Sequence, residues 1–406
     1  FLDANIVLSH VQGSKDAITR TQENLTHLFN RVDASHLDVD PNRTSLTGTG
    51  GLFAIGKVGG KHVNYETGFK WVSPELELND IGFLRSADDI TQFVNLSYRT
   101  IKPVSIFRDL KVRLSQFSKS DFEGNHNRLQ YDLYGDIRFV NNWTLDFGAA
   151  YSPRNYMNTT LRGGPRWRIS KNGYQYLFIN SDKRKKFYTK LGAIISQSKG
   201  NEFSFLKIEA ELNYQPTNAL NISIAPEYSS RPSKTQYITQ ASYTNGTRYV
   251  LGTIDNQTFQ ASIRFDYTLN PNLSIQYYGQ PFVSRGVYTD LKYVTNATAA
   301  RLNDRFQQYA PEQVNLINGA YSIDENFDGT SDYNFENPDF SRVLFNSNLV
   351  LRWEYIPGSE MFLVWSQGVI SSVSPSIGLF EDLETGILDQ RPQNIFLLKL
   401  TYRFVM

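Results

Sequence analysis

The feature that most constrains the fold is a repeated alternation of apolar and polar residues in segments of about ten residues. One side of the segment at residues 396–404 carries only Phe396, Leu398, Leu400, Tyr402 and Phe404. The other side includes Lys399 and Arg403. Strands with one apolar face, one polar face and aromatic residues near their ends are typical of transmembrane β-barrels.

The same alternation recurs along most of the chain. The clearest examples are the hairpin formed by residues 128–140 and 143–151, and the pair of segments 206–214 and 220–228. Counting all such segments predicts an all-β fold, a transmembrane antiparallel β-barrel of about 16 strands formed by residues 1–406. A soluble β-sandwich or solenoid also alternates, but it does not need bulky apolar residues on one face and charges on the other in almost every strand.

Composition agrees with a barrel and excludes several other classes. The chain contains 24 Tyr and 27 Phe, yet its mean hydropathy is only −0.41. No run of 18 apolar residues is present, which excludes a helical membrane span. The net charge of +1 and the scattered basic residues predict no nucleic-acid partner. The absence of cysteine is compatible with export to the outer membrane.

Short turns rich in Gly, Pro, Asn and Asp alternate with long connections, as expected when turns lie on one side of a membrane and loops on the other. The short turns include residues 141–142, 270–272 and 357–359. The long connections are predicted at residues 11–50, 73–87, 153–172, 290–340 and 372–391.

The polar faces of the predicted strands carry both signs of charge in equal number. This balance predicts no simple ion selectivity. It fits a ladder of ion pairs that braces the wall, and it also fits a passage for a polar, neutral solute. The residues are Lys111, Arg113, Arg138, Lys207, Arg264, Arg352, Lys399, Arg403, Asp132, Asp136, Asp146, Glu209, Glu211, Glu227, Asp266 and Glu354.

One predicted loop has the spacing of a calcium site. Oxygen-bearing side chains alternate along it and Gly329 occupies the position of the sharp turn. The closing glutamate of a complete calcium loop is replaced by Phe335. The alternative is an acidic, solvated loop; in either case we expect no catalytic role. The candidate ligands are Asp324, Asn326, Asp328, Thr330 and Asp332.

No motif for catalysis is recognisable. The five histidines are scattered without the spacing of a zinc site, and there is no GxSxG or GxxxxGK sequence. The sequence therefore predicts no enzymatic activity for residues 1–406. Several aromatic residues are candidates for sugar stacking, although a position at the membrane interface is the favoured explanation for them. They are Tyr277, Tyr278, Phe282, Trp353 and Trp365.

Three stretches carry a family resemblance: residues 73–83 (SPELELNDIGF), residues 161–165 (LRGGP) and residues 352–359 (RWEYIPGS), the last running into residues 362–367 (FLVWSQ). The chain resembles the large outer-membrane β-barrels of Bacteroidota that have no assigned function and carry an N-terminal module similar to carbohydrate-binding family 9. The resemblance implies that this chain is the C-terminal part of a longer protein. It supplies no catalytic residues.

We therefore expect a protein of the outer membrane whose direct partner is the lipid bilayer. The expected function is passage or surface handling of polar solutes such as glycans or peptides. One alternative is a structural scaffold that binds other outer-membrane or surface proteins. Another is a glycan-binding protein or hydrolase that acts through the N-terminal module. Calcium in the 324–332 loop is the only expected cofactor.

Overall fold

Long antiparallel strands make up most of the chain. The computed structural model describes residues 1–79, 82–244, 246–376 and 378–404. The long strands are β1 (Leu2–Gln12), β2 (Ser45–Lys57), β3 (Val63–Val72), β4 (Asp89–Arg99), β5 (Phe107–Ser120), β6 (His126–Phe139), β7 (Thr144–Met157), β9 (Asn172–Asn180), β10 (Phe187–Ser198), β11 (Ser204–Thr217), β12 (Leu220–Ser230), β14 (Gly246–Asn270), β15 (Leu273–Val294), β20 (Phe340–Ile356), β21 (Ser359–Val373) and β22 (Gln393–Leu400).

The remaining elements are short, except for β13, and most lie in the connections. They are β8 (Trp167–Ile169), β13 (Ser233–Tyr243), β16 (Phe306–Gln308), β17 (Val314–Ile317), β18 (Ala320–Ile323), β19 (Tyr333–Glu336), the helices α1 (Lys15–Glu23) and α2 (Leu379–Leu388), and the 3₁₀ turns η1 (Lys199–Asn201), η2 (Leu302–Asp304) and η3 (Pro311–Gln313). Within the described residues, neither α1 nor α2 has the length and apolar character needed to cross a membrane.

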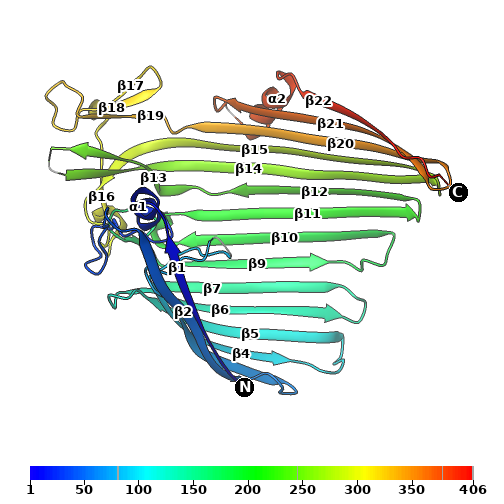
Figure 1. Ribbon diagram of the computed structural model, residues 1–406, viewed down its shortest axis with the longest axis horizontal. Coiled ribbons are helices and arrows are strands. Elements are labelled where there is room, and N and C mark those ends of the chain that lie inside the picture. The colour runs from blue at the N-terminus through cyan, green and yellow to red at the C-terminus, as the bar shows by residue number, and fades with distance from the viewer. Residues whose placement is uncertain (80–81, 245, 377, 405–406) are drawn as a thin grey trace.

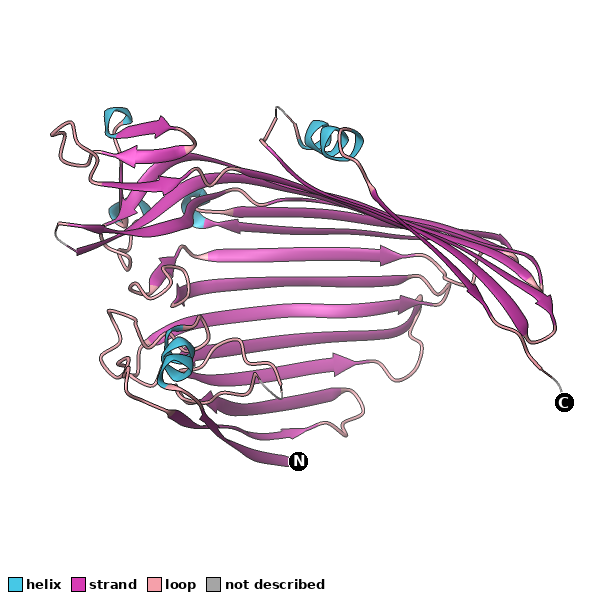
Figure 2. Cartoon of the chain, turned by 45° about the horizontal axis from the view of Figure 1, so that its top comes forward, coloured by secondary structure: helices cyan, strands magenta, loops and turns pink. Residues whose placement is uncertain are grey.

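Nineteen strands of the described chain form one antiparallel sheet. Its sixteen long strands follow one another in a continuous ladder from β1 to β22 (Figure 1). The other three, β8, β13 and β16, pair only with β7, β14 and β15 and lengthen the sheet at one end. Among the described residues β1 pairs only with β2, and β22 only with β21, so the sheet is open between its two edges (Figure 2). The predicted all-β antiparallel fold is confirmed, whereas closure into a barrel stays a prediction.

The sheet has two chemically different faces, and the strand register fixes which residues share a face. In β6 and β7, Tyr131 lies opposite Tyr151 and Leu133 opposite Ala149, while Asp132 alternates with them on the other side. We call the two sides the apolar face and the polar face. The apolar face is uncovered over much of its area: Ile6 in β1 is 77% exposed. A sheet in water normally buries its apolar face, so this exposure has to be explained.

Short turns lie at one end of the strands and long connections at the other (Figure 1). The predicted turns at residues 141–142 and 357–359 are confirmed, with Asn142 and Gly358 in the left-handed region at φ 65° and 80°. The long connections are residues 13–44, 73–88, 158–171, 295–339 and 374–392. The predicted connection at 290–340 starts later because β15 continues to Val294. We call this end of the sheet the loop end.

The two helices pack on opposite faces of the sheet. The side chain of Ser14 caps α1 by accepting a hydrogen bond from the Ala17 amide at 3.2 Å. Ile18 of α1 packs on the buried Leu46. Phe53 of β2 lies on the apolar face of the sheet. Leu46 is an odd number of residues away from Phe53 along the same strand, so its side chain lies on the polar face.

Helix α2 instead covers part of the apolar face near the loop end. Its residues Leu379, Leu383 and Ile387 pack around Val283 and Val343, which are fully buried. These two valines lie opposite each other in β15 and β20 and share the face of Ile275. The helix therefore shields one region of a face that is elsewhere exposed.

Candidate functional site

Ion pairs connect neighbouring strands on the polar face. Lys207 in β11 lies 2.9 Å from both Glu209 and Glu227, and Lys190 in β10 lies 2.7 Å from Glu209. This chain of contacts joins β10, β11 and β12. The structure thus brings together three of the charged residues predicted for this face, Lys207, Glu209 and Glu227, in the arrangement of a bracing ladder.

A row of three aromatic side chains runs along the polar face of β9. The ring centroids of Tyr174 and Tyr176 are 6.4 Å apart and nearly parallel, and those of Tyr176 and Phe178 are 5.8 Å apart. The strands on both sides carry glycine beside this row. Gly148 lies opposite Tyr176, and Gly192 lies opposite Phe178.

These glycines allow the rings to lie against the neighbouring backbone. A Cβ atom on Gly148 would fall 2.3 Å from the Tyr176 ring, and one on Gly192 would fall 2.0 Å from the Phe178 ring. Any larger residue would push the rings away from the wall. We call Tyr174, Tyr176 and Phe178 the aromatic row; flat rings held in line offer stacking surfaces to a sugar or another flat solute.

At the loop end, two connections fold over the polar face. Leu76, which is 2% exposed, packs so closely on β2 that a Cβ atom on Gly48 would fall 2.1 Å from its backbone nitrogen. His27 bridges the two connections, with its Nδ1 2.7 Å from the Pro74 carbonyl oxygen and its Nε2 3.0 Å from Glu77. Residues 13–44 and 73–79 therefore form a joined cover, which we call the inner cap.

The electrostatics of Glu77 fit its place in the inner cap. Partial burial favours the neutral acid, but hydrogen bonds from the Asn79 amide and from His27 outweigh it and lower the pKa of Glu77 below its usual value. The carboxylate is therefore ionised at neutral pH and holds His27 in place.

The predicted calcium residues lie together in the loop between β18 and β19. Asp324 accepts hydrogen bonds from the amides of Asp328 and Gly329, at 3.2 and 2.9 Å. Asn326 and Asp332 likewise accept from the amides of Asp328 and Glu325, at 2.9 and 2.7 Å. In the described chain no group of three or more His, Asp or Glu side chains is arranged to hold a metal ion. Calcium binding stays a prediction.

The last candidate ligand, Thr330, donates its hydroxyl to Asp328. Hydrogen bonds from Thr330 and Asn326 lower the pKa of Asp328. The loop is therefore a compact turn held together by its own carboxylates.

Strands β17, β18 and β19 form a separate small sheet. Glu325, inside the same loop, attaches this small sheet to the main one. It accepts two-pronged hydrogen bonds from Arg248 of β14, at 2.6 and 3.0 Å, and a third from the Tyr333 hydroxyl at 2.8 Å. The Glu325 contact raises the pKa of Arg248. The Arg248 guanidinium also lies over the rings of Tyr243 and Tyr293 at 4.6 and 4.8 Å.

A buried ion pair organises the centre of the loop end. Glu202, after η1, and Arg305, after η2, are each 1% exposed and lie 3.1 Å apart. Glu202 also accepts hydrogen bonds from the Trp167 indole and the Ser170 amide, at 3.1 and 2.7 Å. Burial lowers the pKa of Arg305, while the Glu202 carboxylate opposes this effect. Every oxygen of Glu202 is thus satisfied, as a buried charge requires.

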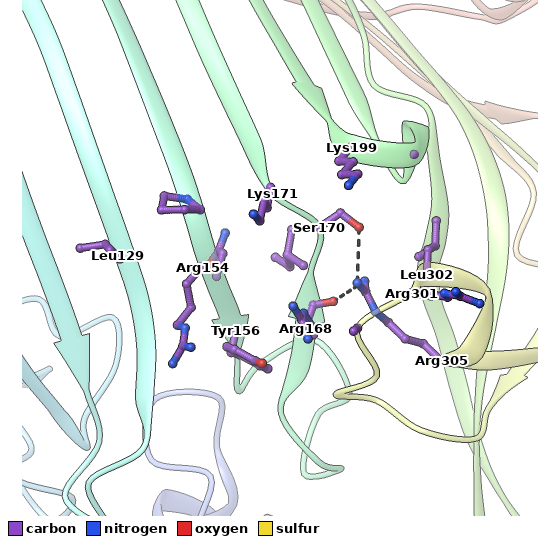
Figure 3. A pocket seen from close by; sticks show the side chains of 15 residues that line it. Leu129, Arg154, Tyr156, Arg168, Ser170, Lys171, Lys199, Arg301, Leu302 and Arg305 are labelled. Carbon is purple, nitrogen blue, oxygen red and sulfur yellow. Dashed lines mark hydrogen bonds between the residues drawn. The ribbon is translucent and has the colours of Figure 1, made fainter.

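A cavity of about 710 Å³ lies beside this ion pair (Figure 3). Arg305 forms part of its wall and donates hydrogen bonds to the Arg168 carbonyl oxygen and the Ser170 hydroxyl, at 2.7 and 3.4 Å. Five further cations line the cavity, and among the described residues no Asp or Glu does. They are Arg154, Arg168, Lys171, Lys199 and Arg301. We call it the cationic pocket.

Residues 3–405 match the model of a family described as a domain of unknown function, DUF5916. The chain belongs to this family. Among solved structures, one described as a bacterial polysaccharide outer membrane secretin is similar, at 8% sequence identity and a TM-score of 0.31. That match covers 88% of this chain and 91% of the other. No curated protein matches.

Two features of this DUF5916 chain were missed by the sequence analysis. The aromatic row has a visible signal, since Tyr174, Tyr176 and Phe178 alternate within one strand. The residues suggested instead for sugar stacking are divided between the two faces of the sheet. Tyr277, Trp353 and Trp365 lie on the apolar face, whereas Tyr278 and Phe282 lie on the polar face. The cationic pocket has no local signal, because its residues come from five separate stretches of the DUF5916 domain.

Proposed function

We propose that this chain forms an outer-membrane β-barrel whose interior passes or handles polar solutes such as glycans or peptides. The observation that supports it best is the sheet with two chemically distinct faces over sixteen long strands. In β6 the apolar face runs from Tyr131 to Phe139, nine residues with an aromatic residue at each end. A tilted strand crosses a bilayer with about 9–11 residues, and aromatic residues favour the interfaces.

The aromatic row supports a glycan as the solute. Its rings lie on the face that would line the interior, within a wall that is otherwise polar and charge-balanced. Lys190 sits 5.1 Å from the Phe178 ring and supplies a hydrogen-bond donor beside the stacking surface. Rings combined with polar neighbours are suited to sugars, which have apolar ring faces and hydroxyl-bearing edges.

The inner cap bears on how a solute would enter. It covers the polar face at the loop end through His27 and Leu76, so passage requires that residues 13–44 and 73–79 leave at least part of the interior free or move aside. A barrel that opens only when its cap moves fits the proposal of gated passage.

The test is single-channel conductance of the purified protein in planar bilayers, with maltohexaose added as the glycan probe. We expect open-channel current that the oligosaccharide blocks transiently. Replacing the aromatic row by alanine, as Y174A/Y176A/F178A, should weaken the block by about tenfold, since stacking contributes on the order of 0.5–1.5 kcal/mol per aromatic contact. The control is Tyr151→Ala, a neighbouring tyrosine on the apolar face. If the protein shows no conductance, and a variant that lacks the connection at residues 295–339 shows none either, the passage function is contradicted.

The second candidate is a closed barrel that serves as a scaffold for envelope proteins. The inner cap and the buried Glu202–Arg305 pair favour it, because both make the loop end a firm, structured surface. Extraction in mild detergent should then recover a partner protein in fixed proportion, together with no conductance in the bilayer. Recovery of the chain alone contradicts the scaffold.

A further inference from the structure

The cationic pocket carries an unusual surplus of positive charge. No ion pair is found for Arg154, Arg168, Lys171, Lys199 or Arg301 within the described part of the chain. By contrast Lys190, Lys207 and Arg305 all contact carboxylates. In a chain whose net charge is only +1, five uncompensated cations around one cavity form a local anion-attracting site.

The pocket opens on the apolar face of the sheet and not toward the polar face. Arg154 lies opposite Leu129 in the β6–β7 register, and Leu129 shares its side with the apolar-face residues Tyr131 and Leu133. Beyond a bulge in β7 the alternation continues, so that Tyr156 and its partner Arg168 follow on the same side. Figure 3 shows these side chains together beside the loop that carries Arg305.

Along the strand direction, the pocket lies just beyond the exposed residues of the apolar face, on the side of the loop end. Tyr131 and Tyr151 lie opposite each other on the apolar face and are 50% and 49% exposed, as expected of an interface belt. Because of the bulge in β7, Arg154 pairs with Leu129, which is two residues beyond Tyr131 in β6, so it lies about 7 Å further along the strand toward the loop end. Lipid head groups occupy this level, next to the hydrocarbon core.

The wall of the pocket is mixed in a way that suits a lipid. Leu129, Ile169 and Leu302 contribute apolar surface beside the cations. Arg and Lys bind phosphate strongly, and Arg does so with two parallel hydrogen bonds. A soluble phosphate ion would need the cations but would gain nothing from the apolar wall.

We propose that the cationic pocket binds the phosphate groups of a membrane lipid on the outer side of the protein. This inference rests on the proposed position of the sheet in a membrane. Arg154 and Arg168 hold the phosphate against the wall, and Lys171, Lys199 and Arg301 surround its open side. The acyl chains then follow the apolar face past Leu129 and Tyr131.

The experiment measures binding of lipid A, a phosphorylated glucosamine lipid, to the purified protein in detergent micelles. The pocket variant is K171A/K199A/R301A. These three residues are exposed and their side chains make no hydrogen bond in the described structure, so the variant should fold. Each cation near an anionic lipid surface contributes on the order of 1 kcal/mol, so the variant should bind about 100-fold more weakly.

The matched control is K183A/K185A/K186A, which removes the same charge from the exposed turn between β9 and β10 at the opposite end of the sheet. It should bind lipid A like the unchanged protein. Enzymatically dephosphorylated lipid A should bind weakly both to the unchanged protein and to the control variant. Equal affinity of the pocket variant and the unchanged protein for lipid A would overturn the proposal. So would tight pyrophosphate binding at the pocket with no lipid A binding, because it assigns a soluble anion instead.

Flotation of the same proteins with liposomes separates this inference from the proposed function. If the protein floats with the liposomes but Lys171, Lys199 and Arg301 do not contribute to lipid A binding, only the pocket proposal is overturned. If the protein binds lipid A in micelles but never enters liposomes, the proposed membrane barrel is contradicted. The pocket then binds phosphate, but its position relative to a membrane no longer explains why the ligand is a lipid.

Discussion

At the scale of single residues, the Glu202–Arg305 pair is a buried contact that holds two connections of the loop end together. Both residues are 1% exposed, and they connect the turn after β10 to the loop after β15. A buried charge that loses its partner costs far more than an exposed one, because it can neither regain water nor find another counter-charge.

Glu202→Gln should therefore loosen the loop end. The amide keeps the size of the side chain but removes its charge, so Arg305 stays buried without a counter-ion; the expected loss is about 3 kcal/mol of local stability. The measurement is the rate at which a protease cuts residues 295–305 under native conditions. The control Glu312→Gln changes an exposed carboxylate in the same long connection and should leave the rate unchanged. Equal cleavage of both variants would show that the pair is not a structural support.

At the scale of elements, the 324–332 loop has the spacing of a calcium site and also attaches the small sheet β17–β19 to β14. Glu325 within it holds Arg248 of β14, so the position of the small sheet β17–β19 depends on the shape of this turn. The carboxylates of Asp324 and Asp328 accept hydrogen bonds from backbone amides and from the Thr330 hydroxyl. An ion that drew these oxygens together would make the turn stiffer.

The second prediction concerns this loop. Calcium should slow proteolysis between residues 326 and 331 at least about fivefold relative to a chelator, and D324A/D328A should abolish the difference. Asp389→Ala, an exposed aspartate in another connection, should keep it. Identical cleavage of the unchanged protein with calcium and with chelator would leave the loop as an acidic turn stabilised by its own hydrogen bonds.

The strands were predictable because the alternation of apolar and polar residues is a local signal with a period of two. The hairpin of β6 and β7 and the turns at 141–142 and 357–359 follow directly from it. The extra length of β14 and β15 was not predicted, since their ends near Val250 and Lys292 pack under loops and lose the simple alternation. The cationic pocket and the Glu202–Arg305 pair depend on contacts between distant loops, which the sequence alone does not show.

At the scale of the whole molecule, the two open edges decide whether the sheet can sit in a membrane. Neither β1 nor β22 has a second partner strand among the described residues. About half of the backbone amides of an edge strand point outward, so the two edges expose about nine unpaired N–H groups, each costing several kcal/mol in lipid. A membrane location therefore requires that both edges be paired.

Direct pairing of β1 with β22 would satisfy both edges, and an even number of strands makes that pairing antiparallel. The third prediction tests it with cysteines, which the natural chain lacks. Asn5→Cys on the polar face of β1 is combined in turn with cysteine at Gln393, Ile395, Leu397 or Lys399, on the same face of β22. One of these pairs should form a disulfide within a single chain in liposomes, because the bond needs Cα atoms about 4.4–6.8 Å apart.

The positive control is the pair N5C/L52C, whose residues lie opposite each other in β1 and β2. If this control forms its disulfide while every β1–β22 pair stays reduced, the two edges do not meet, and further strands or another protein must lie between them. Disulfides that join two copies of the chain would place the β1 edge of one molecule against the β22 edge of another. A single-chain bond at one register position and not at the others would establish both closure and the stagger of the barrel, because a shift of two residues moves the paired Cα atoms about 7 Å apart along the strand.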